Sequence, residues 1–311
     1  MTAGKPQSQF NIFKETYKAE FVLILVTFSW GLTFPLMKLS LDFISVMLFN
    51  FIRFVITFIF FCIIFRKEIE LSNIKSNYKY WKFGFLIGTF LFFGFIFQTI
   101  GLKYTTASKS GFITSTSIVI IPFAQYFILK SKPKIENIVG GIIVMAGLFI
   151  LTDTFFSIPN IGDILTFICA FSFAVYIVLL DKYSVKINLH QLLFGQFFSM
   201  VILSFVFMLF FEVYLFSEFN FNFKEILILT LLYNSLIATL LSILMMTKYQ
   251  HKTSSLRAGI IYSMESVFAA FFSYLILNDK LNKSQIIGIF IMFIGLIISE
   301  FYTLLKLKIK S

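Results

Sequence analysis

The stretch TTASKSG at residues 105–111 reappears as TSSLRAG at residues 253–259. When the two copies are extended without a gap, the same offset also pairs glycines: Gly140 with Gly288, and Gly147 with Gly295. Upstream, a slightly different offset pairs FSWG at residues 28–31 with FSFA at residues 171–174, and Arg53 with Gln196. Because several landmarks share one register, we predict that the chain contains two copies of one structural unit.

The composition indicates a membrane protein. Of 311 residues, 59% are hydrophobic and only 13% are charged, whereas a soluble domain carries about 25% charged residues. A soluble chain of this size needs polar groups over its water-exposed surface, so an ordinary soluble enzyme is excluded. A disordered chain is also excluded, because ample apolar material is available for burial. We therefore predict a polytopic membrane protein with short loops.

Ten apolar runs are long enough to form membrane helices. A helix needs about 20 apolar residues to cross the hydrocarbon layer, within a working range of about 17–25. Long continuous runs predict helices rather than a barrel, whose strands would be short and alternating. The predicted spans are residues 21–39, 43–65, 83–102, 111–129, 135–151, 161–180, 192–211, 226–246, 258–277 and 286–305.

Five predicted spans fall in each copy. Because five is odd, the second copy must lie upside down relative to the first, which is the inverted-repeat plan of many secondary transporters. We therefore predict an all-α membrane protein with ten transmembrane helices in two inverted five-helix repeats around a central cavity. The predicted repeats are residues 20–152 and 160–305, flanked by a cytoplasmic N-terminal segment, 1–19, and a cytoplasmic tail, 306–311.

Lysine and arginine in the loops predict the orientation, because cytoplasmic loops carry an excess of these residues. With both termini in the cytoplasm, the cytoplasmic side holds Lys5, Lys14, Lys18, Arg66, Lys67, Lys75, Lys79, Lys82, Lys130, Lys132, Lys134, Lys182, Lys186, Lys248, Lys252, Lys306, Lys308 and Lys310. The loops of the other side hold Lys103, Lys224, Lys280 and Lys283. We therefore place the chain in the cell (inner) membrane with both termini cytoplasmic, and we read the net charge of +11 as an orientation signal rather than a nucleic-acid signal.

Several longer stretches resemble one known family. They are SWGLTFPLMK from Ser29, FNFIRF from Phe49, QTIGLKYTTASKSGFI from Gln98, IENIVGGIIVMAGLFIL from Ile135 and MESVFAAFFSYLILNDKLNKSQIIG from Met264. Over nearly its whole length, the sequence resembles the drug/metabolite transporter superfamily, EamA type. The resemblance implies ten helices in two inverted repeats around a central cavity, and movement of small metabolites, often by export.

The sequence departs from that family at three positions. The family commonly has Glu-Pro where this chain has Glu265-Ser266, and a glutamate where this chain has Asp279. The matching acidic position of the first repeat falls at Ser131. These departures leave the predicted fold intact but weaken any transfer of a substrate from the family.

Two charged residues lie in the middle of predicted spans, where a charge costs about 2.5–3.5 kcal/mol on insertion scales. Glu265 is a candidate substrate-amine partner or proton carrier, and its alternative role is a structural hydrogen bond to a neighbouring helix. Arg53 keeps its charge and needs a carboxylate, carbonyls or water; it is a candidate anchor for an anionic group, or a structural clamp. The sequence leaves open whether Arg53 meets Glu265.

Other polar residues are weaker candidates. Trp30 and Thr33 precede Pro35, which removes a backbone hydrogen bond and is expected to kink its helix or simply to pack. Uncharged mid-span residues are candidates to line a polar interior, with helix-to-helix hydrogen bonding as the alternative: Gln98, Ser115, Tyr176, Gln196, Asn234 and Tyr262. Charged residues near span ends are predicted to act as gates or interfacial anchors: Lys38, Lys109 and Arg257.

The remaining features have structural interpretations. Asp163 opens a predicted span, where a carboxylate caps the helix N-terminus, and Asp153, Asp181 and Asp279 are interpreted as loop charges. Six glycines are predicted to allow close helix packing rather than to touch substrate: Gly84, Gly88, Gly140, Gly147, Gly288 and Gly295. The two cysteines, Cys62 and Cys169, lie in apolar runs and form no metal or disulfide motif.

These features favour a secondary active transporter, exporter or exchanger, of small organic metabolites. No P-loop occurs, so ATP is not expected to drive it, and no cofactor or metal is expected. The alternatives are a channel or lipid-moving protein on the same fold, and a membrane-embedded enzyme, which would need a catalytic constellation that the sequence lacks. The expected partners are a small-molecule substrate and the lipid bilayer, with proton coupling as one option and a monomer or homodimer as the assembly.

Overall fold

The computed structural model describes residues 5–69, 78–152, 160–215, 219–278 and 282–308, and these residues are almost entirely helical. Asp153, Asp279, Lys75, Lys280 and Lys310, which the loop and orientation predictions used, lie outside the described residues. The first five spans are α1 (Lys5–Ser40), α2 (Val46–Ile64), α4 (Tyr78–Tyr104), α5 with α6 (Ala107–Ser115 and Ser117–Leu129) and α7 (Ile135–Thr152).

The second five spans complete the bundle. They are α8 (Ile161–Ser184), α9 with the π-helix η2 (Leu189–Phe207 and Met208–Leu215), α10 with η3 and α11 (Glu225–Leu232, Tyr233–Leu241 and Ser242–Tyr249), α12 with α13 (Ser255–Ser263 and Glu265–Leu277) and α14 (Lys283–Lys308). Within the described part of the chain, eight spans are long and apolar enough to cross a membrane, and α7 and α14 contain the shorter apolar helices Ile135–Ile150 and Lys283–Ser299. The prediction of ten helices is confirmed.

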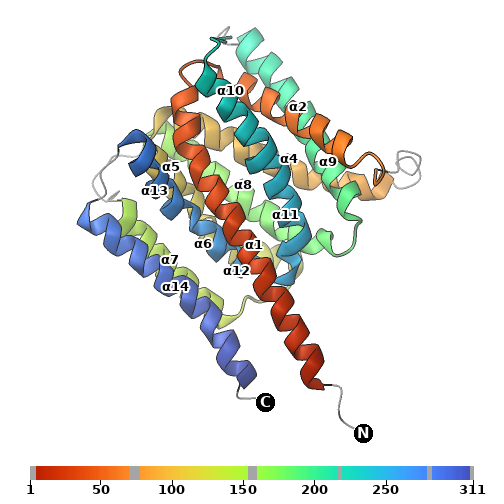
Figure 1. Cartoon of the computed structure of the whole chain (residues 1–311), viewed down its shortest axis with the longest axis vertical. Coiled ribbons are helices and arrows are strands. Elements are labelled where there is room, and N and C mark those ends of the chain that lie inside the picture. The colour runs from red at the N-terminus through yellow and green to blue at the C-terminus, as the bar shows by residue number, and fades with distance from the viewer. Residues whose placement is uncertain (1–4, 70–77, 153–159, 216–218, 279–281, 309–311) are drawn as a thin grey trace.

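The two repeats run in opposite directions. α1 begins and α14 ends at the same end of the bundle, which we call the terminal face (Figure 1). At the other end, the distal face, Lys38 of α1 donates to the Leu102 and Thr105 carbonyls, both at 2.9 Å, where α4 turns into α5. Asn160, the N-cap of α8, donates to the Tyr104 carbonyl of the same turn at 3.1 Å. α8 therefore begins where α1 ends, and the second repeat is inverted.

The outer surface of the bundle is apolar and its interior is unusually polar. Large apolar side chains point outward, among them Phe123 at 65% exposed and Ile135 at 72%. Polar side chains such as Asn50, Gln196 and Asn234 are fully buried. This distribution suits a lipid surround, because lipid tails solvate apolar side chains whereas polar groups must find partners inside the protein.

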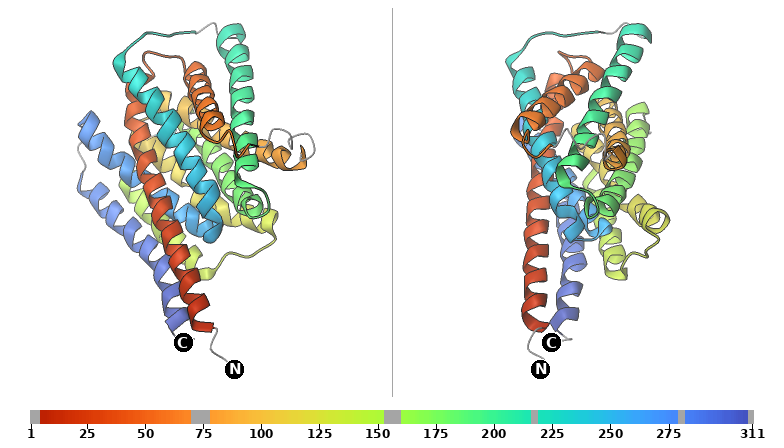
Figure 2. Two further views of the ribbon diagram at one scale, coloured as in Figure 1. Left: turned by 45° about the vertical axis from the view of Figure 1, so that its right-hand side comes forward. Right: turned by 90° about the vertical axis from the view of Figure 1, so that its right-hand side faces the viewer.

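Glycines bring α7 and α14 into close contact, and the two helices lie side by side (Figure 2). A Cβ atom added to Gly140 would lie 2.8 Å from the Gly295 carbonyl oxygen, and one added to Gly147 would lie 2.7 Å from the Gly288 carbonyl oxygen. Side chains at these positions would separate the helices. The prediction that these glycines form packing surfaces is confirmed.

The fourth and ninth spans are interrupted in the same way. α5 and α6 meet at Thr116, and α12 and α13 meet at Met264. Serine and threonine hydroxyls around each interruption bond to backbone carbonyls, as Thr116 does with Ile113 at 2.6 Å and Ser266 with Ser263 at 2.9 Å, and such bonds bend helices. α1, by contrast, continues without interruption through Pro35. The sequence left Pro35 open between a kink and simple packing, and α1 is continuous there. The two interruptions fall at positions that the sequence did not single out.

Candidate functional site

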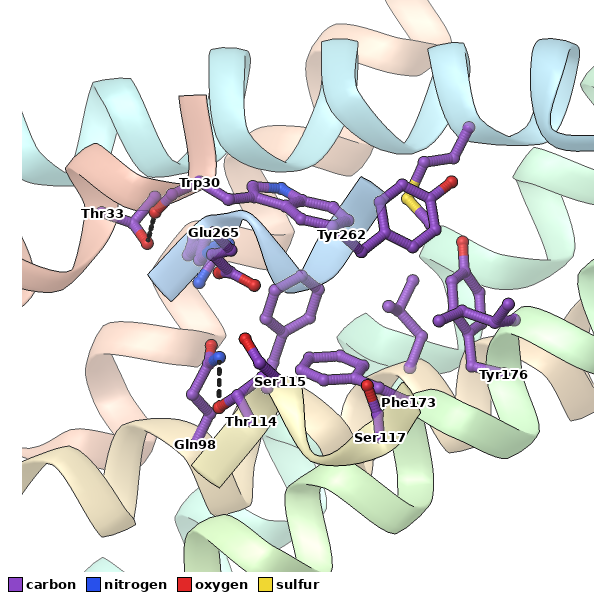
Figure 3. A pocket seen from close by; sticks show the side chains of 15 residues that line it. Trp30, Thr33, Gln98, Thr114, Ser115, Ser117, Phe173, Tyr176, Tyr262 and Glu265 are labelled. Atoms are coloured by element: carbon purple, nitrogen blue, oxygen red, sulfur yellow. Dashed lines mark hydrogen bonds between the residues drawn. The ribbon is translucent and has the colours of Figure 1, made fainter. Parts of the chain in front are cut away.

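A cavity lies between the two repeats, where the interrupted spans cross (Figure 3). Its volume of about 30 Å³ suits roughly two water molecules, since one water needs about 10–15 Å³. Residues from both repeats line it: Trp30, Thr33, Arg53, Leu91, Phe95, Gln98, Thr114, Ser115, Ser117, Phe173, Tyr176, Ile177, Met246, Tyr262 and Glu265.

Arg53 is held from two sides. Its Nε donates to Thr239 Oγ1 at 2.7 Å, and its guanidinium carbon lies 4.3 Å from the centroid of the Phe95 ring. Thr239 belongs to η3, where its hydroxyl also donates to the Asn234 carbonyl five residues earlier, at 2.6 Å. A π-helical turn is a common feature of functional sites, and here it supplies the hydroxyl that orients Arg53.

Glu265 is the first residue of α13, directly after the interruption at Met264, and its carboxyl group lies at the cavity (Figure 3). The residue is 7% exposed, yet no other described residue donates a hydrogen bond to its carboxyl oxygens. A buried carboxyl group without a protein donor is costly unless water or a ligand supplies one. Its free acceptor capacity therefore points into the cavity.

Arg53 and Glu265 share the cavity without forming a direct ion pair. Their opposite charges attract each other, but among the ion pairs of the described residues, which extend to 4.0 Å, none joins these two. The sequence left open whether Arg53 meets Glu265. In the structure, their charged groups are separated by more than 4.0 Å. Such a gap leaves both groups able to bind water or a ligand.

Hydrogen bonds tie the cavity walls to one another. Ser115 donates to the Ser263 carbonyl at 3.1 Å, which joins the two interrupted spans. Trp30 Nε1 donates to the Ala238 carbonyl at 2.8 Å, and its ring lies 5.7 Å from that of Tyr262. Tyr262 in turn donates to Gln250 at 3.2 Å on the terminal side of the cavity. These contacts position the cavity walls around the two charges in this conformation.

Most of the predicted polar residues meet at this cavity, including Trp30, Thr33, Gln98, Ser115, Tyr176 and Tyr262. Two predicted residues do not line it. Gln196 accepts from Tyr176 at 3.4 Å behind the cavity wall, and Asn234 donates to the Thr230 carbonyl within its own span at 2.9 Å. The sequence reading missed Phe95, Thr239 and Ser117. Of these three residues, only Ser117 could have been found from the sequence, because the repeat offset pairs it with Glu265.

The three predicted gate residues lie at the two ends of the bundle. Lys38 binds carbonyls at the end of α4, a favourable place for a cation, rather than reaching out to the membrane surface. Lys109 forms an ion pair with Asp163 at 2.7 Å near the distal face. Arg257 forms one with Glu20 at 2.8 Å near the terminal face. The capping role predicted for Asp163 is confirmed, because it completes a capping box with Asn160.

A larger cleft of about 900 Å³ opens between α2, α4, α8 and η2, and its walls are mostly apolar. Glu212 in this cleft accepts from the backbone nitrogens of Met47 and Leu48 and from the Ser45 hydroxyl. Its carboxylate therefore caps the start of α2, where the helix dipole favours a negative charge. We assign this residue a structural role.

Comparisons with known proteins agree with this architecture. The EamA-like transporter family matches the chain twice, over residues 17–153 and 160–301. A protein named an uncharacterized transporter from Archaeoglobus fulgidus is 36% identical over 282 residues, which cover 90% of this chain and 85% of that protein. The uncharacterized transporter YoaV of Bacillus subtilis is 22% identical over 90% of this chain and 95% of its own length.

A solved structure has the same fold. It superposes with a TM-score of 0.72 over 96% of this chain and 99% of the other chain, at 16% identity. At that identity the likeness concerns the fold alone. The family itself is shown by the two matched copies and by the similarity to proteins named as transporters, which together cover nearly the whole chain. On these grounds the chain, a multi-pass membrane protein, belongs to the EamA-like transporter family.

Proposed function

We propose that the chain is a secondary active transporter that exports or exchanges small organic metabolites across the cytoplasmic membrane by alternating access. Membership of a transporter family supports transport in general. The observation that carries the finer proposal is the cavity between two inverted repeats, where Arg53 and Glu265 lie without a direct ion pair. Uncompensated charges inside a membrane are costly and are typically kept for function.

The size of the cavity favours a carrier that changes shape. About 30 Å³ is far too small for an organic metabolite, so the repeats must move apart before a substrate enters. Two inverted repeats that lie around one fixed site can rock against each other and expose that site to each face in turn. A channel would instead need a continuous polar path through the bundle.

The lining favours a substrate with both charged and apolar parts. Arg53 offers its charge to an anionic group, and its planar guanidinium suits a carboxylate or phosphate. Glu265 offers an acceptor to a cationic group, or a site for a coupling proton. Aromatic rings beside them, such as Trp30 and Phe173, provide an apolar wall for the rest of the molecule.

Purified protein in liposomes tests this function. A thermal-shift screen against metabolite pools identifies ligands, because a compound that binds only the folded state raises its apparent stability. Each stabilising compound is then tested for counterflow, in which unlabelled solute inside the liposomes accelerates uptake of labelled solute. We expect saturable uptake with such acceleration. Flux that rises linearly with concentration and ignores solute on the other side would overturn the carrier in favour of a channel.

A further inference from the structure

Two ion pairs occupy equivalent positions in the two repeats. The offset that pairs the residue stretches 105–111 and 253–259 also pairs Lys109 with Arg257, and the upstream offset that pairs Arg53 with Gln196 also pairs Asp163 with Glu20. Lys109 contacts Asp163 and Arg257 contacts Glu20, so both partners of one pair match both partners of the other.

The surroundings of the two ion pairs match as well. The Thr105 hydroxyl donates to Asp163 at 3.0 Å, and its equivalent, Thr253, donates to Glu20 at 3.3 Å. The basic residue of each pair lies in the first turn of an interrupted span, which begins after a threonine or serine N-cap at Thr106 or Ser254. One local structure is thus present twice, in opposite orientation.

Each ion pair joins one repeat to the other. The distal pair connects α5 of the first repeat to α8 of the second, and the terminal pair connects α12 of the second repeat to α1 of the first. A movement that separates the two repeats at one face therefore stretches the ion pair at that face.

The ion pairs lie on opposite sides of the cavity. Along α1, Glu20 belongs to the terminal pair, Trp30 and Thr33 line the cavity, and Lys38 binds the turn that carries Thr105 of the distal pair. Lys38 lies eighteen positions after Glu20, which corresponds to roughly 27 Å of helix. One ion pair therefore lies between the level of the cavity and each face of the bundle.

From these observations we propose that Lys109–Asp163 and Arg257–Glu20 are the distal and terminal gates of the transporter, and that each face opens when its own pair separates. This inference rests on the proposed function, because a gate presupposes passage. The chemistry suits repeated opening: the attraction within a buried ion pair is largely offset by the cost of removing its charges from water. When a face opens, water hydrates the two charges again, so the free energy needed to separate the pair is small.

Thiol accessibility tests the gates without knowledge of the substrate. The natural cysteines are replaced by Cys62→Ala and Cys169→Ala, and a reporter is introduced at the cavity wall by Ser117→Cys. Membrane vesicles of both orientations are treated with a membrane-impermeant thiosulfonate reagent, and protease cleavage of a C-terminal tag identifies the exposed face. The measured quantity is the rate at which the reporter is modified from each face.

We expect Lys109→Gln to raise the modification rate from the distal face, and Arg257→Gln to raise it from the terminal face, each by about tenfold or more. Single variants leave one buried carboxylate unpaired, so the double variants Lys109→Gln/Asp163→Asn and Arg257→Gln/Glu20→Gln are measured in parallel. The charge-exchanged variant Arg257→Glu/Glu20→Arg is expected to restore slow modification from the terminal face. Lys224→Gln and Lys248→Gln, which remove exposed lysines outside the pairs, are the matched controls for the two faces.

Equal acceleration from both faces, or no acceleration in folded double variants, would overturn the gates. Folding is checked by size-exclusion chromatography and thermal melting. Counterflow in the same preparations separates the two proposals. Normal counterflow with face-independent modification would refute the gates alone, whereas face-selective modification without any carrier flux would refute transport alone.

Discussion

Arg53 and Glu265 carry most of the chemical information at the scale of single residues. Each is buried in the middle of a span and each keeps unused hydrogen-bonding capacity at one small cavity. In a purely structural ion pair the two groups would be in direct contact, because a charge that stays buried without a partner is costly. Their separation therefore favours roles in which a ligand, water or a proton mediates between them.

The variant Glu265→Gln tests proton coupling. Glutamine keeps the shape and one acceptor oxygen of the side chain but cannot carry a proton. We expect uptake driven by an imposed pH gradient to fall to the level of protein-free liposomes, while counterflow without a gradient survives. Gradient-driven uptake at the normal rate, with its pH dependence intact, would exclude Glu265 as the proton carrier.

The variant Arg53→Lys tests whether the planar cation is required. Lysine retains the charge but loses the Nε bond to Thr239 and the stacking on Phe95. Since a charge-assisted hydrogen bond contributes about 1.5–3 kcal/mol and a desolvated cation–π contact about 2 kcal/mol, we expect the half-saturating substrate concentration in counterflow to rise about tenfold or more. Arg66→Lys, the same change at an exposed position, should leave that concentration unchanged.

The sequence could identify polar mid-span residues, but it could not decide which of them face each other. Gln98 and Asn234 look alike as isolated amides within apolar runs, yet only Gln98 lines the cavity. The difference depends on how each helix is rotated against its neighbours, and packing across the bundle decides that rotation. Phe95 and Thr239 were missed for a related reason, because their roles exist only through contact with Arg53.

At the scale of helices, the apolar runs predicted the number of spans well, because each span must satisfy its own backbone hydrogen bonds. The interruptions at Thr116 and Met264 escaped prediction, since neither glycine nor proline lies there. At each interruption a hydroxyl bonds to the carbonyl three residues earlier, from Thr116 in one span and from Ser266 in the other, and such bonds bend helices. Such hydroxyls also occur in uninterrupted spans, so the pattern alone does not predict a break.

Two adjacent glycines allow a sharp test of the contact between α7 and α14. A Cβ atom at Gly140 would lie 2.7 Å from the Ser299 Cβ, whereas one at Gly141 would lie 3.6 Å from Ile118 Cδ1, an ordinary contact. We expect Gly140→Ala to lower the free energy of unfolding by about 1–3 kcal/mol. Gly141→Ala should be neutral or stabilising by up to about 1 kcal/mol, because alanine favours helix.

Thermal unfolding of both glycine variants in detergent measures this difference. Equal melting temperatures for the two variants would contradict the close packing at Gly140. A lowered melting temperature together with unchanged counterflow would indicate that the contact holds the bundle together but does not move during transport.

At the scale of the whole molecule, the two repeats keep the same architecture while their chemistry differs. The interrupted spans and the ion pairs occur in both, but the glutamate at position 265 is matched by serine at position 117. The centre of the molecule is therefore chemically asymmetric although its frame is symmetric. A symmetric frame with an asymmetric centre suits a carrier. The two equivalent ends can open in turn, while one fixed set of groups at the centre holds the substrate.

Orientation is the remaining property of the whole molecule, and the distribution of lysine and arginine predicts it. The described chain begins with α1 and ends with α14 at the same face (Figure 1), and positively charged loops favour the cytoplasm. We expect a fluorescent protein fused to the C-terminus to be bright and an alkaline phosphatase there to be inactive. The same phosphatase fused after Asn222, in the loop before α10 at the distal face, should be active. The opposite pattern would mean that the terminal face is extracellular and the distal face cytoplasmic. Each gate would then serve the other side of the membrane. The residues that form each gate would stay the same, because they depend only on which helices each ion pair joins.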